Sequence, residues 1–587
     1  MRTLGVILCT LLWSGFSAPR SGATVYYSNG SAANVQALQN QARDGDTITL
    51  PAGTFSWTSR VDITKGITLK GQTTITGAGT ANPTVNSLTI IQDNSPRLTK
   101  SSGVITMTLT PGQSGRITGL TITHGRSTIF NQNGVVQLVS TGNAPNYTMR
   151  VDHCFFDHVY DRAVRVGGWC YGVMDHNVVH AQGNGQCFFA NNGTGTDPQG
   201  HGPWADYSWF GTNKFFFMED NTVVGNGIVP TSGSTDGAFG ARFVIRHNYF
   251  ITTGVSSHGT EGNVRGNRAC EMYDNIFNWN PLHPTSQLRS GNMLAHDNTW
   301  LGQPSNNGAH TQIVLYRAIG GSGKLGGNWG TADGTDPWDM NATEGNGTYV
   351  EGHAPHLYES GAASTTASGG TLIDSSKNWA TDQWVGYSVR NSNPAAAPYK
   401  KGSYIISNTA TTLTYLFYSS GDRGPALVFN AGDSYEIHKL LATLDQPGRG
   451  KGDLVVGQNP PVNTVTRTQH WTHELAEPSF SWNNVYTPTN AAWGYGTRSP
   501  TLLQGRDYYN LGAGFPANTT PPGVSSTYTA AINGVDYVGP FVYPHPLVTG
   551  APIPTPSAPH HFRQKDEKEG KKAKGGKWGK GQRKLGE

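Results

Sequence analysis

The sequence contains little charge, few cysteines and no long hydrophobic run. Asp, Glu, Lys and Arg make up 14% of the 587 residues, and only five residues are Cys. Cys9 lies in an apolar stretch near the N-terminus. Cys154, Cys170, Cys187 and Cys270 show no CxxC spacing, which excludes the usual zinc motifs. These four allow three disulfide connectivities, with buried free thiols as the alternative.

The lack of an apolar run of about 18 residues excludes a transmembrane helix. The N-terminus instead has Met1-Arg2, an apolar run from Leu4 to Trp13, and then small residues. This pattern is typical of a secretory signal peptide, which we assign to residues 1–23 with cleavage at Ser21-Gly22-Ala23. We therefore predict an exported protein, secreted or periplasmic.

Positive charge is concentrated at the C-terminus. Residues 562–587 hold ten Lys/Arg and four Asp/Glu, a net of +6, whereas the whole chain is +4, so the remainder carries −2. Without Arg2 and Arg20 the mature body is near −4, which gives no reason to expect nucleic-acid binding. Residues 551–587 are Pro-rich and then basic, and we expect disorder. Contact with an anionic cell surface is one role for this tail, and solubilisation is the other.

An internal repeat is the main structural signal. An Asn follows a polar residue and precedes strand-forming residues at positions 177, 221, 248, 275 and 298, with spacings of 44, 27, 27 and 23. Cys154 takes the same place 23 residues before Asn177. A period of this size, in a chain with 76 Gly, predicts coils of a three-strand solenoid. We expect the Asn side chains to adopt the left-handed turn conformation and to bond from coil to coil as a ladder.

The region before the repeat predicts a cap for the open end of the solenoid. Residues 33–43 form a short amphipathic helix with Val35, Leu38 and Ala42 on one face. The segments GDTITLPAGTF and ITLKG follow, at residues 45–55 and 67–71. Together these resemble the opening of pectate-lyase-like β-helix proteins, and the resemblance covers roughly residues 30–300. It implies an all-β fold, a right-handed parallel β-helix, in a superfamily of polysaccharide lyases, glycosidases and phage or surface adhesins.

The rest of the chain divides by composition. We assign residues 24–361 to the parallel β-helix and 362–438, where short strands alternate with turn residues, to a small inserted β module. Residues 439–550 are expected to continue and close the β-helix, before the tail at 551–587. The 44-residue step between Asn177 and Asn221 holds an insertion at 183–211. Its aromatic residues are candidates for stacking on sugar rings or for a small core of the loop itself: Trp204, Tyr207 and Trp209.

The densest group of ionisable residues spans two coils. Counted back from the corner Asn, Lys214 and Arg268 are both at minus seven and Arg242 is at minus six, an offset that reverses the face of a strand unless a bulge restores it. The candidate catalytic residues are His258, Arg268, Glu271, Arg242 and Lys214. The candidate substrate-binding residues are Arg265, Glu261, Asp236, Trp204, Tyr207 and Trp209.

This group fits two reactions. Elimination across a uronic acid needs a base for the C5 proton and a positive group or Ca²⁺ that neutralises the carboxylate. In the families that the chain resembles, Arg, Lys or His is the base, and Ca²⁺ is a candidate cofactor. A glycoside hydrolase would instead use two carboxylates, for which Asp236, Glu261 and Glu271 are available. A non-catalytic glycan-binding protein is the third alternative.

Each candidate also has a structural explanation. Arg268 and Glu271 are three residues apart and suit an ion pair, and His258-Gly259 suits a turn. We favour a lyase acting on an acidic polysaccharide over a hydrolase or a binder. The sequence names neither the polysaccharide nor a metal ligand.

Overall fold

The computed structural model describes most of the chain. It covers residues 22–96, 103–125, 134–142, 144–193, 208–227, 231–260, 265–280, 286–302, 309–315, 357–385, 387–395, 402–417, 427–438, 446–450, 475–497, 499, 502–505, 507–511, 537 and 539–555. Residues 1–21 of the expected signal peptide (1–23) and residues 556–587 of the expected tail (551–587) lie outside this set. Among the described residues, no helix is long and apolar enough to cross a membrane.

Three columns of strands, here called sheets A, B and C, form the body. Sheet A is parallel throughout. Its strands are, in spatial order, β1 (Val25–Tyr27), β2 (Thr47–Thr49), β5 (Thr68–Lys70), β10 (Gly115–Thr118), β13 (Asn146–Asp152), β16 (Cys170–Asp175), β19 (Phe216–Glu219), β22 (Arg242–Arg246), β24 (Ala269–Tyr273), β27 (Asn292–His296), β38 (Ser479–Trp482) and β42 (Tyr508–Leu511).

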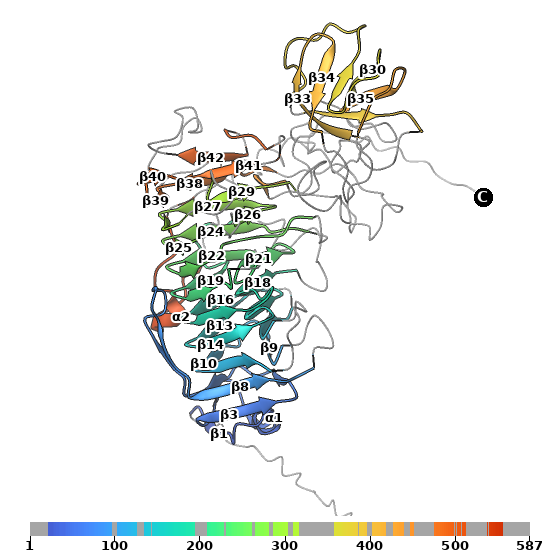
Figure 1. Ribbon diagram of the computed structural model, residues 1–587. Coiled ribbons are helices and arrows are strands. Elements are labelled where there is room, and N and C mark those ends of the chain that lie inside the picture. The colour runs from blue at the N-terminus through green and yellow to red at the C-terminus, as the bar shows by residue number, and fades with distance from the viewer. Residues whose placement is uncertain are drawn as a thin grey trace, which may run out of the picture.

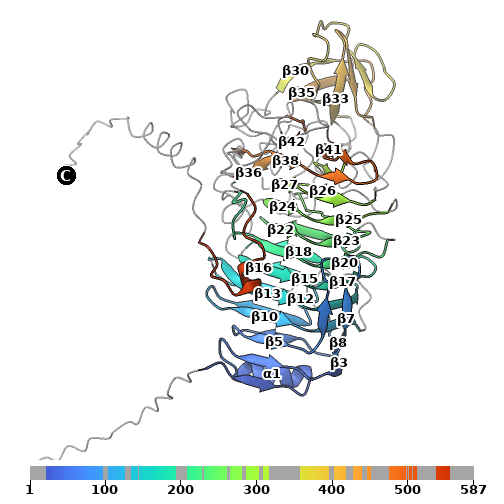
Figure 2. The ribbon, with the colours of Figure 1, turned by 90° about the vertical axis from the view of Figure 1, so that its left-hand side faces the viewer.

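Sheets B and C stand beside it (Figure 1, Figure 2). Sheet B contains β3 (Gly53–Trp57), β8 (Thr89–Asp93), β11 (Thr121–His124), β14 (Phe155–Val159), β17 (Val178–Ala181), β20 (Thr222–Val224), β23 (Tyr249–Ile251), β25 (Ile276–Asn278), β28 (Thr299–Trp300), β39 (Val485–Tyr486) and β40 (Ala491–Ala492). Sheet C contains β4 (Val61–Ile63), β9 (Ile105–Leu109), β12 (Val136–Ser140), β15 (Val164–Gly167), β18 (Phe188–Asn191) and β21 (Thr235–Ala238). The bridges Thr235↔Val255 and Ser256↔Gln287 carry this column on to β26 (Ser286–Leu288), β29 (Thr311–Ile313) and β41 (Tyr495–Thr497).

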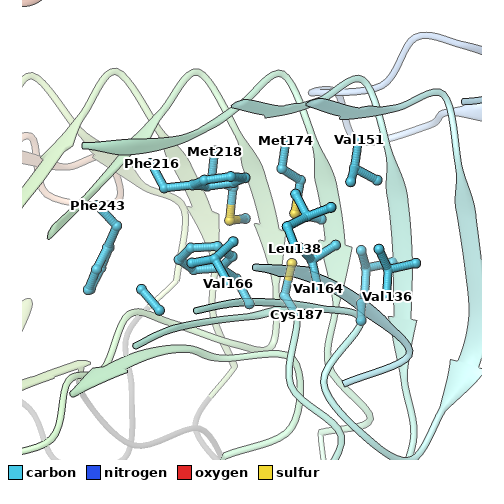
Figure 3. Close-up of a cluster of buried hydrophobic side chains, with 14 of the residues drawn as sticks. Val136, Leu138, Val151, Val164, Val166, Met174, Cys187, Phe216, Met218 and Phe243 are labelled. Carbon is cyan, nitrogen blue, oxygen red and sulfur yellow. The ribbon is translucent and has the colours of Figure 1, made fainter. Parts of the chain in front are cut away.

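Each coil passes from sheet A to B to C, as β16, β17 and β18 do, so the fold is the expected parallel β-helix. Alternate residues of each strand point inward, because side chains alternate between the two faces of a sheet. Figure 3 shows this interior, where Val164 and Val166 of β15 pack toward Met174 and Phe216 of sheet A. Stacking of coils extends one continuous apolar core along the whole solenoid.

The expected ladder of corner Asn side chains is present between sheets A and B. The Nδ2 of Asn221 donates to Oδ1 of Asn248 at 3.0 Å, and Asn248 donates likewise to Asn275 at 3.0 Å. The ladder runs from Asn177 through Asn298 to Asn484. We expected each corner Asn to adopt the left-handed turn conformation, and this expectation was wrong by one residue. The left-handed conformation belongs to the residue before each Asn, for example His247 and Asp274, each at φ 54°, and this frees the Asn for the ladder.

A short helix closes the N-terminal end of the solenoid. At the N-terminal end, helix α1 (Ala32–Gln41) begins at Ser31, whose hydroxyl accepts from the amide of Asn34, and buries Val35 against the core. The strands β6 (Thr74–Thr76) and β7 (Thr84–Asn86) form a hairpin, and β36 (Arg449–Gly450) pairs with β37 (Leu475–Ala476).

All four described cysteines are buried free thiols, so the disulfide alternative is not realised.

The small β module is inserted between coils. Its antiparallel sheet contains β30 (Leu357–Ala362), β31 (Thr371–Ile373), β32 (Ser388–Asn391), β33 (Gly402–Asn408), β34 (Thr412–Tyr415) and β35 (Ser434–His438). In Figure 1 it stands beyond the end of the solenoid opposite α1. After the module the chain returns, and β38 pairs directly with β27.

The C-terminal segment runs back along sheet A. Residues 537 and 539–550, including α2 (Pro546–Thr549), cover the outer side of this sheet from β13 to β38, and α2 lies beside β13 and β16 (Figure 2). A second apolar cluster forms beneath the segment, with Phe217, Val244 and Leu294 from sheet A against Tyr537 and Phe541. The covered part of this face is therefore an interior surface of the protein, whereas at the N-terminal end of sheet A Val25 and Tyr27 of β1 are 49% and 80% exposed.

Candidate active site

A row of side chains follows the outer face of sheet C, the face that points away from the core. The register pairs Arg165 of β15 with Phe189 of β18, and Phe189 with Asp236 of β21. Their neighbours Val164 and Phe188 belong to the core cluster. Because side chains of aligned residues stack across parallel strands, Arg165, Phe189 and Asp236 lie in one row on one face.

Asp236 holds His258 in a fixed position. The Nδ1 of His258 lies 2.7 Å from Oδ1 and 2.6 Å from Oδ2 of Asp236, and the amide of His258 donates to the carbonyl of Gly237 at 2.7 Å. Asp236 is buried, whereas the imidazole of His258 is 28% exposed. The paired Nδ1 leaves Nε2 on the far side of the ring, and Nε2 makes no hydrogen bond with any residue that the structure describes.

Cations surround the carboxylate of Asp236. Arg289 places Nη2 3.7 Å from Oδ1 of Asp236 and donates through Nε to the carbonyl of Ser257. Burial alone would raise the pKa of Asp236, but the charge and hydrogen bond of His258, followed by the charges of Arg289 and Arg162, lower it to about 2. Asp236 is therefore an anion at neutral pH, suited to orient an imidazole and to stabilise its charged form.

Two arginines, Arg165 of the row and Arg162 just before β15, lie near Phe189. The guanidinium of Arg162 stacks 3.6 Å from the ring centre of Phe189, and its Nε donates to Gln186 at 2.9 Å. Arg165 lies 5.8 Å from the same ring centre. Burial lowers the pKa of Arg162 to about 10 and also lowers the pKa of Arg165, and both remain cations at neutral pH. The face thus combines an oriented imidazole with three guanidinium groups.

This arrangement supplies the two elements of a proton abstraction next to an anionic group. A histidine whose Nδ1 is held by a carboxylate presents Nε2 as a general base. Guanidinium groups bind carboxylates in a planar, two-point geometry. A substrate with a carboxylate and an acidic C–H beside it matches both.

The other described candidates lie on sheet A or in the turns that lead into it. The amide of Asn267, between Arg265 and Arg268, donates to the carbonyl of His258 at 2.9 Å, but the side-chain contacts given below are made with other partners. Arg242 donates to the carbonyl of Ser208 at 2.6 Å and is buried. Lys214 lies with its ammonium 3.3 Å from the ring centre of Trp209, which is itself 8% exposed within the cluster under the C-terminal segment. The one-residue offset between Lys214 and Arg242 remains in the structure, because β19 and β22 pair without a bulge, with Phe216 opposite Phe243.

Arg268, Glu271 and Arg265 are likewise buried. Arg268 lies 2.6 Å from Glu477, a residue beyond the inserted module, so the ion pair anticipated with Glu271 is made with another partner. Glu271 accepts from the amide of Gly211 at 2.8 Å, and burial raises its pKa to about 7. The candidates Glu261, Trp204 and Tyr207 lie outside the described residues.

Arg162, Arg165, Phe189 and Arg289 were not among the candidates from sequence. Spacing from the corner position does not align them, because Arg165 stands eleven residues after Cys154 and Phe189 twelve after Asn177, and an offset of one residue reverses the face of a strand. The insertion before β21 also moves Asp236 to fifteen residues after Asn221, so spacing alone hides the row.

Calcium does not fit the described residues of this face. Ca²⁺ takes about six to eight oxygen ligands. The carboxylate of Asp236 is instead paired with His258 and Arg289. Among the described residues, a group of three His, Cys, Asp or Glu side chains close enough to share an ion occurs on sheet B, at Asp157, His158 and His180.

Comparisons with known proteins establish no family. No family model matches the chain, and no curated protein matches it. Among solved structures, a match is found to the tailspike of the Pseudomonas phage phi297, at 9% sequence identity and a TM-score of 0.14, over 69% of this chain and 91% of the tailspike chain. At that TM-score the match carries no argument about fold or function.

Proposed function

We propose that the protein is a polysaccharide lyase that cleaves a uronate-containing polysaccharide by β-elimination, with His258 as the base. The observation that carries the proposal is the pair formed by His258 and Asp236 on an outer face of the solenoid. The ring has one nitrogen fixed by a buried carboxylate and the other available to a substrate. Arg165 and Arg289, which are partly exposed on the same face, match the carboxylate of a uronate.

The proposed reaction balances within this set of residues. The Nε2 of His258 takes the C5 proton, the electrons of that C–H bond form a C4=C5 double bond, and the bond from C4 to the glycosidic oxygen breaks. The departing oxygen takes a proton from the imidazolium, which returns His258 to its neutral form. A guanidinium on the uronate carboxylate stabilises the charge that develops next to C5. Asp236 acts through His258 and is a positioning residue.

The described carboxylates favour elimination over hydrolysis. A hydrolase needs a carboxylic acid that keeps its proton near neutrality. Asp236 has a pKa of about 2 and is ionised there. Glu271 has a pKa of about 7, but it faces the C-terminal segment on sheet A and not the row on sheet C.

The test is a panel of uronate polysaccharides, read for two products. Pectate, alginate, glucuronan and glycosaminoglycans are incubated with the full-length protein, and both the ultraviolet absorbance of the unsaturated uronate and new reducing ends are measured. We expect absorbance to rise with at least one polymer and His258→Ala to abolish the rise. His153→Ala is the matched control, because His153 also bonds a buried carboxylate, that of Asp152 at 2.8 Å, but at a corner of sheet A.

The other outcomes contradict the proposal in distinct ways. Reducing ends without the chromophore would indicate a hydrolase. Binding with neither product would indicate a glycan-binding surface protein. Full activity of His258→Ala would remove His258 from the mechanism.

The setting that we propose for this activity is outside the cell or in the periplasm. The signal-peptide pattern of residues 1–23 supports export. The basic tail supports contact with an anionic cell surface.

A further inference from the structure

The outer face of sheet B holds a second group of chemically reactive side chains. Asp157 and His158 come from β14, and His180 comes from β17 in the next coil. One ligand atom of each lies within 4.8 Å of those of the other two. This group and the candidate active site face outward from different sheets, B and C.

A β-bulge brings these three side chains together. Strand β14 pairs with β17 at Phe155↔Val178 and Phe156↔Val179, and the register then resumes at Val159↔Ala181. Asp157 and His158 therefore both stand opposite His180, where regular pairing allows one residue. A bulge of this kind re-aims a side chain, and such bulges are common next to functional sites.

The bulge changes which way His158 points. Phe156 and Val159 both belong to the core cluster, although they are three residues apart. Regular alternation would place them on opposite faces and turn His158 toward the core. Instead His158 takes a left-handed backbone conformation at φ 53° and is 56% exposed, so both Asp157 and His158 lie outside. This conformation is uncommon for residues other than glycine.

The three side chains face one another closely. The Nδ1 of His158 lies 2.5 Å from Oδ1 of Asp157. The rings of His158 and His180 have centres 5.6 Å apart and are nearly perpendicular, and Phe155 meets the ring of His180 edge-on at 5.1 Å.

We propose that Asp157, His158 and His180 bind a divalent transition-metal ion of the zinc type between two coils of the β-helix. Two imidazoles and one carboxylate are the donor set that suits Zn²⁺ and its neighbours in the periodic table. Three protein ligands leave a coordination position for water. Such an ion would tie β14 to β17 across the bulge.

The ligand chemistry selects against calcium and magnesium. Both prefer oxygen donors, and Ca²⁺ takes about six to eight of them. The next aligned residues on either side are Thr123 of β11 and Val224 of β20, which add no carboxylate to this group. The alternative is a hydrogen-bonded pair of Asp157 and His158 that binds no ion, and the experiment below separates the two.

The experiment compares metal stoichiometry between variants of the full-length protein. Protein without an affinity tag is stripped with a chelator and titrated with Co²⁺, read by its visible absorption, and then with Zn²⁺ in competition. We expect His180→Ala, and separately Asp157→Asn, to bind one ion fewer per chain than the unaltered protein. His153→Ala is the control and keeps the full number, because His153 is a half-exposed histidine beside a carboxylate outside this group. Differences between variants are the readout, since the chain has 19 His in all.

Thermal unfolding gives an independent readout. Zn²⁺ is expected to raise the unfolding temperature of the unaltered protein and of His153→Ala, and to leave His180→Ala unchanged, because an ion that binds only the folded state stabilises it. Equal stoichiometry and equal Zn²⁺ response in all the variants would overturn the proposal. Neither readout depends on lyase activity, so this result stands or falls apart from the proposed function.

Discussion

The outer faces of sheets A and C carry similar residues in different surroundings. On sheet A, Arg246 lies 2.6 Å from Glu219, and neither side chain is exposed. On sheet C, Asp236 is as deeply buried, but its partner His258 is 28% exposed. The Arg246–Glu219 pair on sheet A is closed from the outside, whereas the pair on sheet C presents His258 to it.

The C-terminal segment accounts for the difference. Arg246 donates to the carbonyls of Phe541 at 2.6 Å and Val542 at 2.9 Å, and the amide of His545 donates to Glu219 at 2.8 Å. The segment thus satisfies the polar groups of sheet A as it covers them, which is the condition for burying charge. A repeated fold produces equivalent positions, and what covers each position decides whether an ionisable group is structural or available for chemistry.

The largest expected effect tests the sheet C side of this comparison. Asp236→Asn should lower kcat by about 10³-fold or more, because an amide no longer fixes the tautomer and orientation of His258. Steady-state kinetics per folded molecule, with the substrate found by the panel, separates kcat from KM and measures this loss. A lower yield of folded protein with an unchanged kcat would make Asp236 merely structural.

The next effect tests the sheet A side. Arg246→Met leaves the Glu219 carboxylate buried without its ion pair and should lower the free energy of unfolding by about 3–5 kcal/mol. Arg60→Met is the control, because Arg60 and Asp62 are 49% and 43% exposed and such a pair contributes about 0–1 kcal/mol. Chemical denaturation gives both values. Activity per folded molecule should be retained in both variants, and its loss in Arg246→Met alone would place the active site under the C-terminal segment.

The fold was predictable from sequence to the extent that it repeats. The corner Asn positions revealed the period and the ladder, because each Asn bonds to the same position in the next coil. Ion pairs between distant segments have no such period. Arg268 meets Glu477 only after the inserted module, and Arg246 meets the backbone at Phe541, so neither contact could be read from local spacing. His258 and Asp236 were named among the candidates, but their arginine neighbours were not.

The smallest expected effect contrasts the pH dependence of the two faces. Burial raises the pKa of Glu271 on sheet A from 4.5 to about 7, opposed by the amide of Gly211. Between about pH 4.5 and pH 7, Glu271 therefore keeps a proton in the folded state that it has lost in the unfolded state. The stabilisation is complete below about pH 4.5, falls as pH rises, and is lost above about pH 7. It amounts to roughly 3 kcal/mol, and Glu271→Gln should remove this slope.

Asp236 on sheet C behaves in the opposite sense. Its pKa is lowered to about 2, so it contributes stability above the ordinary Asp value and loses it only as the pH falls toward 2. The titration of Asp236 itself therefore adds no slope between about pH 4.5 and pH 7. Unfolding free energies at several pH values in this window, for the unaltered protein and Glu271→Gln, measure the contribution of Glu271. If the unfolding free energy of Glu271→Gln and of the unaltered protein changes equally with pH, Glu271 is ionised beneath the C-terminal segment. Water would then reach this carboxylate in spite of the apolar cluster around it.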